Sequence, residues 1–191
     1  PNQIQLRESF HYDFGKSPTK NFCANIEQDA MEELLIVGTG EDRFLTLLEK
    51  DILIKEKSFV KPIDLLLTLD INCDGLKEII MTLGKTDADR NYVGGYGILA
   101  LDTNLEEIWG FETVSNGHAL TIVNNNILVG DCACYLYELN PKGDLLRQKR
   151  FSKNEWCSID AVVTHDINGD GRDEIVFVRW FNTPKTGTVS D

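Results

Sequence analysis

The sequence predicts an all-β fold of the β-propeller class, built from four-stranded antiparallel blades, and three observations support that prediction. Short apolar runs recur along the 191 residues at a spacing in the mid-forties, which is the length of one propeller blade. Each period divides into short strands separated by turn residues. Helical periodicity is nearly absent. We therefore expect about three and a half blades, where complete propellers have four to eight.

The spacing of the apolar runs defines the repeat. Three runs end in Gly38, Gly84 and Gly130, and each of these glycines lies 46 residues from the next. A fourth run, 175–178, falls where the next step would land but lacks the glycine. The whole chain, 1–191, is thus predicted to be one propeller domain or a propeller fragment, with approximate blades at 21–60, 61–114, 115–155 and 156–191.

The two ends of the chain predict an incomplete ring. Residues 1–20 contain an outer-type strand, 4–14, with no inner strands before it, and would belong to a neighbouring or closing blade. The last period stops at 187–191, which resembles the start of a third strand. Two arrangements fit: part of a larger propeller, or a small four-bladed ring closed by the N-terminal strand.

The second period shows the expected order of strands within a blade. Its first two strands, 64–69 and 78–83, are near-continuous apolar runs, as is typical of strands buried on both faces. Its third and fourth, 96–101 and 105–111, mix polar and apolar residues, which predicts outer strands. The third period repeats this order at 118–123, 126–130, 134–139 and 144–150.

Two oxygen-rich loops, 70–78 and 166–174, join apolar runs and share one pattern. Positions 1, 3, 5 and 9 are Asp, Asn, Asp and Glu in both, and a backbone carbonyl at position 7 would complete the shell. The candidate ligands are Asp70, Asn72, Asp74, Leu76 and Glu78 in one loop and Asp166, Asn168, Asp170, Arg172 and Glu174 in the other. Such an oxygen shell suits Ca²⁺, and the glycine at position 6 permits a sharp turn. The sequence therefore predicts two calcium sites.

An EF-hand is excluded because position 12 is Met81 or Phe177 rather than Glu, and because the flanks read as strands. The pattern Asp-x-Asn-x-Asp-Gly-x-x-Glu followed by Ile-Ile or Ile-Val closely resembles the FG-GAP/VCBS repeats of integrin-α-like propellers. The resemblance is specific for the 18 residues of the two loops. It implies that each loop joins the first two strands of a blade and binds Ca²⁺ through these positions.

The other two periods modify the loop. Residues 25–33 form a degraded copy of the same length, in which Ala30 replaces the glycine, and we expect it to be empty. The third period replaces the loop by the short turn 124–126. A solvated acidic turn without an ion is the alternative for 70–78 and 166–174, but two copies 96 residues apart favour cation binding. We expect the ions to stiffen blades rather than to sense or catalyse.

Net charge and cysteine content restrict the classes of partner and the cellular location that we expect. The net charge of −12 disfavours nucleic acids and anionic membrane surfaces as partners, and no apolar run approaches the length of a membrane span. The five cysteines are odd in number and scattered, which favours reduced thiols and a cytoplasmic location. Cys132 and Cys134 are expected to lie on one face of a strand as core residues, and His118 has no visible partner.

No nucleophile elbow, phosphate-binding glycine loop or zinc-protease motif is present in the sequence. The leading hypothesis is a non-enzymatic, calcium-stabilised propeller that acts as a protein–protein interaction scaffold, with protein partners that include the rest of a longer propeller chain. Two alternatives remain open: an extracellular calcium-dependent adhesion module, and an accessory propeller domain of a secreted hydrolase or lyase. Fold class alone does not choose among these three functions.

Overall fold

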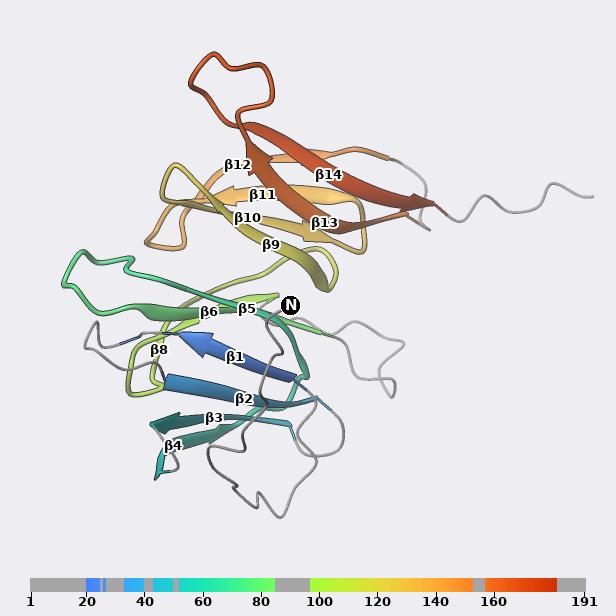
Figure 1. Ribbon diagram of the computed structural model, residues 1–191. Coiled ribbons are helices and arrows are strands. Elements are labelled where there is room, and N and C mark those ends of the chain that lie inside the picture. The colour runs from blue at the N-terminus through green and yellow to red at the C-terminus, as the bar shows by residue number, and fades with distance from the viewer. Residues whose placement is uncertain are drawn as a thin grey trace, which may run out of the picture.

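The computed structural model describes residues 20–24, 26, 33–39, 43–49, 52–84, 97–152 and 157–181, and all its regular elements are β-strands (Figure 1). Three sheets have four strands and a fourth has two, each in sequential antiparallel order. The strands are β1 (Lys20–Ala24), β2 (Glu33–Thr39), β3 (Arg43–Glu49) and β4 (Ile52–Ser58); β5 (Ile63–Leu69), β6 (Glu78–Leu83), β7 (Ile98–Leu101) and β8 (Glu107–Phe111); β9 (Gly117–Val123), β10 (Asn126–Asp131), β11 (Tyr135–Leu139) and β12 (Leu145–Arg150); β13 (Cys157–His165) and β14 (Glu174–Phe181).

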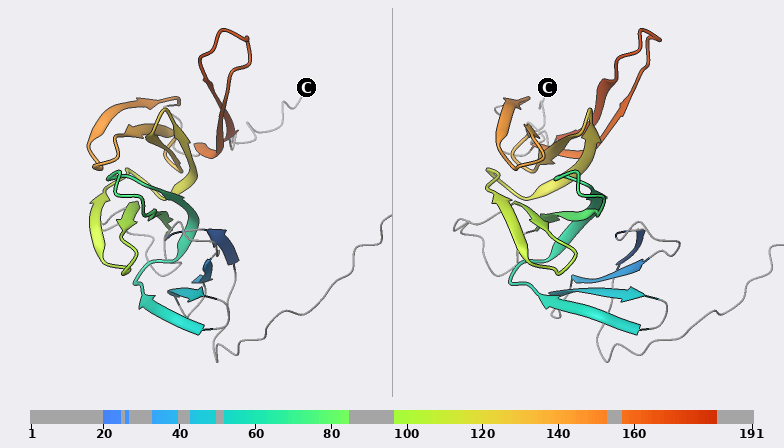
Figure 2. Two further views of the ribbon diagram at one scale, coloured as in Figure 1. Left: turned by 60° about the vertical axis from the view of Figure 1, so that its left-hand side comes forward. Right: turned by 90° about the vertical axis from the view of Figure 1, so that its left-hand side faces the viewer.

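The four sheets follow one another around an incomplete ring, and we refer to them in chain order as blades 1 to 4 (Figure 2). The first strand of each blade, β1, β5, β9 or β13, lies on the inner side of the ring. The predicted all-β propeller of four-stranded antiparallel blades is therefore the fold of this chain. No helix among the described residues is long and apolar enough to cross a membrane.

Burial across a blade corrects one prediction. The third strands are buried rather than outer: all four residues of β7 and the five central residues of β3 are shielded from solvent. Every residue of the fourth strand β12 is exposed. The third strand is an interior strand because it is hydrogen-bonded on both edges and packed between neighbouring blades; only the fourth strand forms the outer edge.

The core consists of three apolar layers, one at each boundary between blades, and a smaller apolar cluster within blade 1. Blades 1 and 2 meet through residues such as Leu35, Leu45 and Met81. Blades 2 and 3 meet through Ile80, Ile98, Val129 and their neighbours, and blades 3 and 4 through Leu128, Ile159 and Val162 among others. Each inner strand is apolar on both faces because one face packs forward and the other backward.

The prediction that the cysteines are reduced thiols is wrong for one pair. Cys134 and Cys157 form a disulfide between blades 3 and 4, with their Cα atoms 5.3 Å apart. Cys134 does not lie on a strand: it ends the turn between β10 and β11, where its φ is +65°. Cys23, Cys73 and Cys132 are free thiols.

Three predicted segments lie wholly or largely outside the described residues. They are the N-terminal strand at 4–14, the start of a third strand at 187–191, and most of the degraded loop, of which only Ile26 and Glu33 are described.

Candidate functional site

The loop 70–78 connects β5 to β6 and turns sharply at two positions. Gly75 has a φ of +94°, as its place at position 6 requires. Cys73, at position 4, also has a positive φ, +62°. Gly169 and Gly171 have positive φ at the same two positions of the twin loop, 166–174. Both loops therefore have two left-handed residues, and the sequence pattern had identified only the second.

Side-chain oxygens of the loop 70–78 accept its own backbone N–H groups. Asp70 Oδ2 accepts from Gly75 at 3.1 Å, Asn72 Oδ1 from Asp74 at 2.8 Å, and Asp74 Oδ1 from Leu76 at 2.7 Å. These bonds resemble the local turns that Asp and Asn commonly form. The loop is therefore shaped by the same side chains that were predicted to bind calcium.

The Glu at position 9 accepts an equivalent backbone hydrogen bond in three blades. Glu78 Oε2 accepts the N–H of Ile71 at 2.8 Å, and Glu174 Oε2 makes the same bond in its own loop at 2.9 Å. In blade 1, Glu33 Oε2 accepts the N–H of Ile26 at 2.6 Å. The degraded loop thus keeps the bond that closes the base of the loop.

The remaining side-chain oxygens of the loop 70–78 are the candidate ligands for a cation. Asp70 Oδ1 is buried and has no hydrogen-bond donor among the described residues. Asp74 Oδ2 and Glu78 Oε1 both receive hydrogen bonds from Asn72 Nδ2, at 2.9 and 3.0 Å. One amide nitrogen therefore bridges two carboxylates, and it would have to give way to Asn72 Oδ1 for all four side chains to offer oxygen.

The electrostatics of Glu78 would favour a bound cation. Burial raises the pKa of Glu78, and the nearby Asp74 and Asp70 carboxylates raise it further, while the hydrogen bond from Ile71 opposes the rise. A carboxylate that is costly to ionise for these reasons gains from a cation. Within the described part of the chain, however, no three acidic, His or Cys side chains converge closely enough to hold a metal ion. The donor set fits Ca²⁺, but the carboxylates would have to move inward to bind it.

The twin loop, 166–174, has the same hydrogen-bond pattern in a more exposed place. It projects from the tip of the β13–β14 hairpin (Figure 1). Asn168 Nδ2 donates to Asp170 at 3.3 Å and to Glu174 at 2.9 Å, as Asn72 does in the first loop. Asp166 differs from Asp70, because both its oxygens accept backbone N–H groups, Oδ1 from Gly169 and Asp170 and Oδ2 from Gly171.

The position-7 residues of the two loops take part through their N–H groups. Leu76 donates to Asp74, and Arg172 donates to Asp170 at 2.9 Å. Coordination by their carbonyls stays a prediction.

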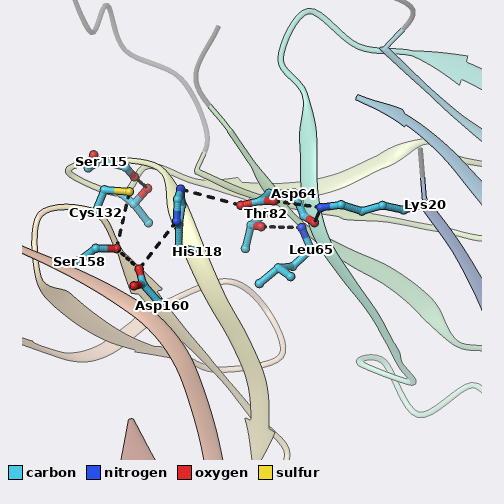
Figure 3. Close-up of polar contacts among 10 residues, drawn as sticks. Lys20, Asp64, Leu65, Thr82, Ser115, His118, Cys132, Ser158 and Asp160 are labelled. Atoms are coloured by element: carbon cyan, nitrogen blue, oxygen red, sulfur yellow. Dashed lines mark hydrogen bonds and ion pairs between the residues drawn. The ribbon is translucent and has the colours of Figure 1, made fainter. Parts of the chain in front are cut away.

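A second polar cluster, the hub cluster, lies on the inner strands and was not expected from the sequence (Figure 3). Lys20 Nζ pairs with Asp64 Oδ1 at 3.0 Å. His118 lies between two carboxylates, with Nε2 3.9 Å from Asp64 Oδ2 and Nδ1 4.0 Å from Asp160 Oδ1. Each of these four residues comes from a different blade, so the cluster joins all four first strands. The expectation that His118 lacks a partner is wrong.

A third polar group, also missed, is buried between blades 2 and 3. The Tyr137 hydroxyl donates to Asp131 Oδ2 at 3.0 Å and accepts the N–H of Val114 at 3.0 Å. Asp131 Oδ2 also accepts the N–H of Ser115 at 3.1 Å. Burial raises the pKa of both Asp131 and Tyr137. The pair fixes the connection between the two blades.

Comparison with solved structures identifies the architecture. The crystal structure of BBS1N in complex with ARL6DN, soaked with mercury, matches with a TM-score of 0.59 and 11% identity over 88% of this chain and 50% of that one. The lead-soaked crystal of the same complex matches with a TM-score of 0.55 and 13% identity, over 76% of this chain and 43% of that one. BamB from Moraxella catarrhalis matches with a TM-score of 0.50 and 16% identity, over 75% of this chain and 40% of that one.

The chain has a propeller fold. It spans half or less of the length of these propeller chains, which agrees with an incomplete ring. At such low identities the likeness shows the fold alone. No family model matches the sequence, and neither does any curated protein.

Proposed function

We propose that this chain is a non-enzymatic β-propeller scaffold for protein partners, in which calcium stiffens the blades through the loop 70–78 and, more weakly, through 166–174. The observation that carries the calcium proposal is the buried Asp70 Oδ1, which has no donor among the described residues, in a loop where the Asp70 and Asp74 carboxylates already raise the pKa of Glu78. An unpaired buried carboxylate oxygen is costly. A hard divalent cation removes that cost and takes oxygen ligands of this kind.

The scaffold part of the proposal is supported by architecture. Three complete blades present exposed outer strands and turns on an incomplete ring, and one of the similar propellers, BBS1N, was crystallised with a protein, ARL6DN. The acidic balance of this chain, −12, favours a partner with a basic surface. The hub cluster and the Asp131–Tyr137 pair have a structural explanation, since each ties blades together.

Calcium titration of matched variants tests the first part. We expect Asp74→Ala to abolish binding at 70–78 and Asp170→Ala to abolish a weaker site at 166–174, by isothermal titration calorimetry. Asp144→Ala, in an exposed turn, is the control and should bind as the wild type does. Equal melting temperatures in calcium and in EDTA, together with unchanged titration heat in both loop variants, would refute calcium stabilisation.

A second candidate, the extracellular calcium-dependent module, is favoured by the Cys134–Cys157 disulfide, because such bonds persist in oxidising compartments. Calcium sites of extracellular modules typically have Kd values of about 10⁻⁴ to 10⁻³ M. A measured Kd below micromolar would argue against this candidate and leave the scaffold proposal standing.

A further inference from the structure

Blade 4, as the structure describes it, is held to the ring by one face only. Ile159 and Val162 of β13 pack on blade 3. The opposite face of the β13–β14 sheet is exposed, with Val176 41%, Val178 60% and Trp180 53% accessible. The corresponding strand of blade 2, β6, is buried along its whole length. Among the described sheets, the two-stranded one therefore has the least packing to keep it in place.

The disulfide lies at the only boundary that this sheet shares with the rest of the described chain. Cys134 ends the β10–β11 turn of blade 3, and Cys157 is the first residue of β13. The two are 23 residues apart, so the bond bypasses β11, β12 and the connection to blade 4. Gly130 of blade 3 lies against the same strand, since an added Cβ would come within 2.4 Å of the Ile159 side chain. The start of β13 is thus both covalently fixed and closely packed.

We propose that the Cys134–Cys157 bond is a redox-controlled clasp, whose reduction by a dithiol releases the β13–β14 sheet from blade 3 while blades 1 to 3 stay folded. One thiolate of the dithiol attacks a sulfur of the bond, and the other cysteine leaves as a thiolate and takes up a proton. The second thiol of the reagent then resolves the mixed disulfide. The protein gains two electrons and two protons, and the dithiol becomes a cyclic disulfide.

Burial limits how fast this bond can be reduced. Cys134 and Cys157 are 0% and 1% accessible, so a reductant reaches the sulfurs only through local opening of the packing around them, with the bond still intact. A third thiol, Cys132, lies close by, with Sγ 3.8 Å from the hydroxyl of Ser158 (Figure 3). Burial raises the pKa of the Cys132 thiol, which keeps it protonated and slows its exchange with the disulfide. Cys132 therefore serves as an internal control, because it lies at the same boundary between blades 3 and 4 but takes no part in the disulfide.

Hydrogen exchange measured by mass spectrometry tests the proposal. The protein is prepared without reductant and compared with the same protein in dithiothreitol, both in EDTA so that calcium binding has no part in the result. We expect exchange of backbone amides in 157–181 to rise about tenfold or more on reduction, as for local unfolding, while 63–83 stays unchanged. Cys157→Ala should show the fast exchange without dithiothreitol and should not respond to it.

Matched variants keep the outcome interpretable. Cys132→Ser and the exposed Cys73→Ser should behave as the wild type does. If Cys157→Ala does not fold, the comparison of oxidised and reduced wild type decides alone. Equal exchange of 157–181 in the two states would overturn the clasp, and so would a parallel rise across all blades. Alkylation of all five cysteines in the unreduced, denatured protein would also overturn it.

Discussion

Replacing Asp131 by Asn converts one oxygen of a buried carboxylate into an amide nitrogen, without changing its size. All four hydrogen bonds at this carboxylate are donated to it. Oδ1 accepts the N–H groups of Ala133 and Tyr135 at 2.9 and 2.8 Å. Oδ2 accepts the N–H of Ser115 and the hydroxyl of Tyr137. Whichever way the Asn side chain lies, its nitrogen faces groups that were donors, and at least one backbone N–H is left unpaired.

The size of the effect follows from that count. A buried donor without an acceptor costs about 1–3 kcal/mol. Removal of a buried charge returns part of this cost, because burial already disfavours the ionised Asp131. We expect a net loss of about 2 kcal/mol in the free energy of unfolding, which for a chain of 191 residues lowers the melting temperature by about 4–8 °C.

Urea denaturation of wild type, Asp131→Asn and a control measures this loss. The control is Asp144→Asn, because Asp144 lies in an exposed turn where its side chain accepts one hydrogen bond, from Asn140 at 2.9 Å. We expect it to change stability by less than about 0.5 kcal/mol. An Asp131→Asn protein as stable as the control would show that the four bonds do not hold the blade connection.

Three further predictions follow from neighbouring features. Gly130→Ala should destabilise the protein by about 1–3 kcal/mol in urea denaturation, because its Cβ would overlap Ile159, and a loss below 0.5 kcal/mol would contradict the close packing. The stability gap between wild type and Asp131→Asn should be largest near pH 4 and shrink as the pH rises towards 7. Burial raises the pKa of Asp131, so its stabilising effect is present at low pH and is lost as the pH passes the folded-state pKa; a gap that widens with pH in the same assay would refute the sign. Asp70→Asn should leave the melting temperature in EDTA unchanged or raise it, since the substitution removes an unpaired buried carboxylate oxygen. It should also abolish the rise in melting temperature that calcium produces in scanning fluorimetry. An undiminished rise would exclude Asp70 as a ligand.

The sequence predicted the parts of this fold that each repeat contains within itself. The strand at 78–83 and the turn at 124–126 were located from apolar runs and turn residues, because their determinants are local. The burial of third strands such as β7 was not, since it depends on the neighbouring blade that covers them.

The hub cluster was missed for the same reason. Its contacts join residues at least 42 positions apart, and no local pattern connects Lys20, Asp64, His118 and Asp160. Alignment of the repeats offered one signal, because Asp64 and His118 are both the second residue of the first strand of a blade. The disulfide likewise pairs a turn with a strand in the next blade, whereas scattered cysteines had suggested free thiols.

The two acidic loops show what a shared motif leaves open. Their side chains are the same at positions 1, 3, 5 and 9 and make the same bonds at positions 3, 5 and 9. Their first residues differ: one oxygen of Asp70 is buried and unpaired among the described residues, whereas both oxygens of Asp166 accept N–H groups in an exposed hairpin tip. A cation at 166–174 would have to compete with those bonds and with water, whereas at 70–78 it would meet an oxygen that is buried and accepts no hydrogen bond from the described residues. The affinity order that we predict, 70–78 above 166–174, therefore rests on burial, which the motif does not encode.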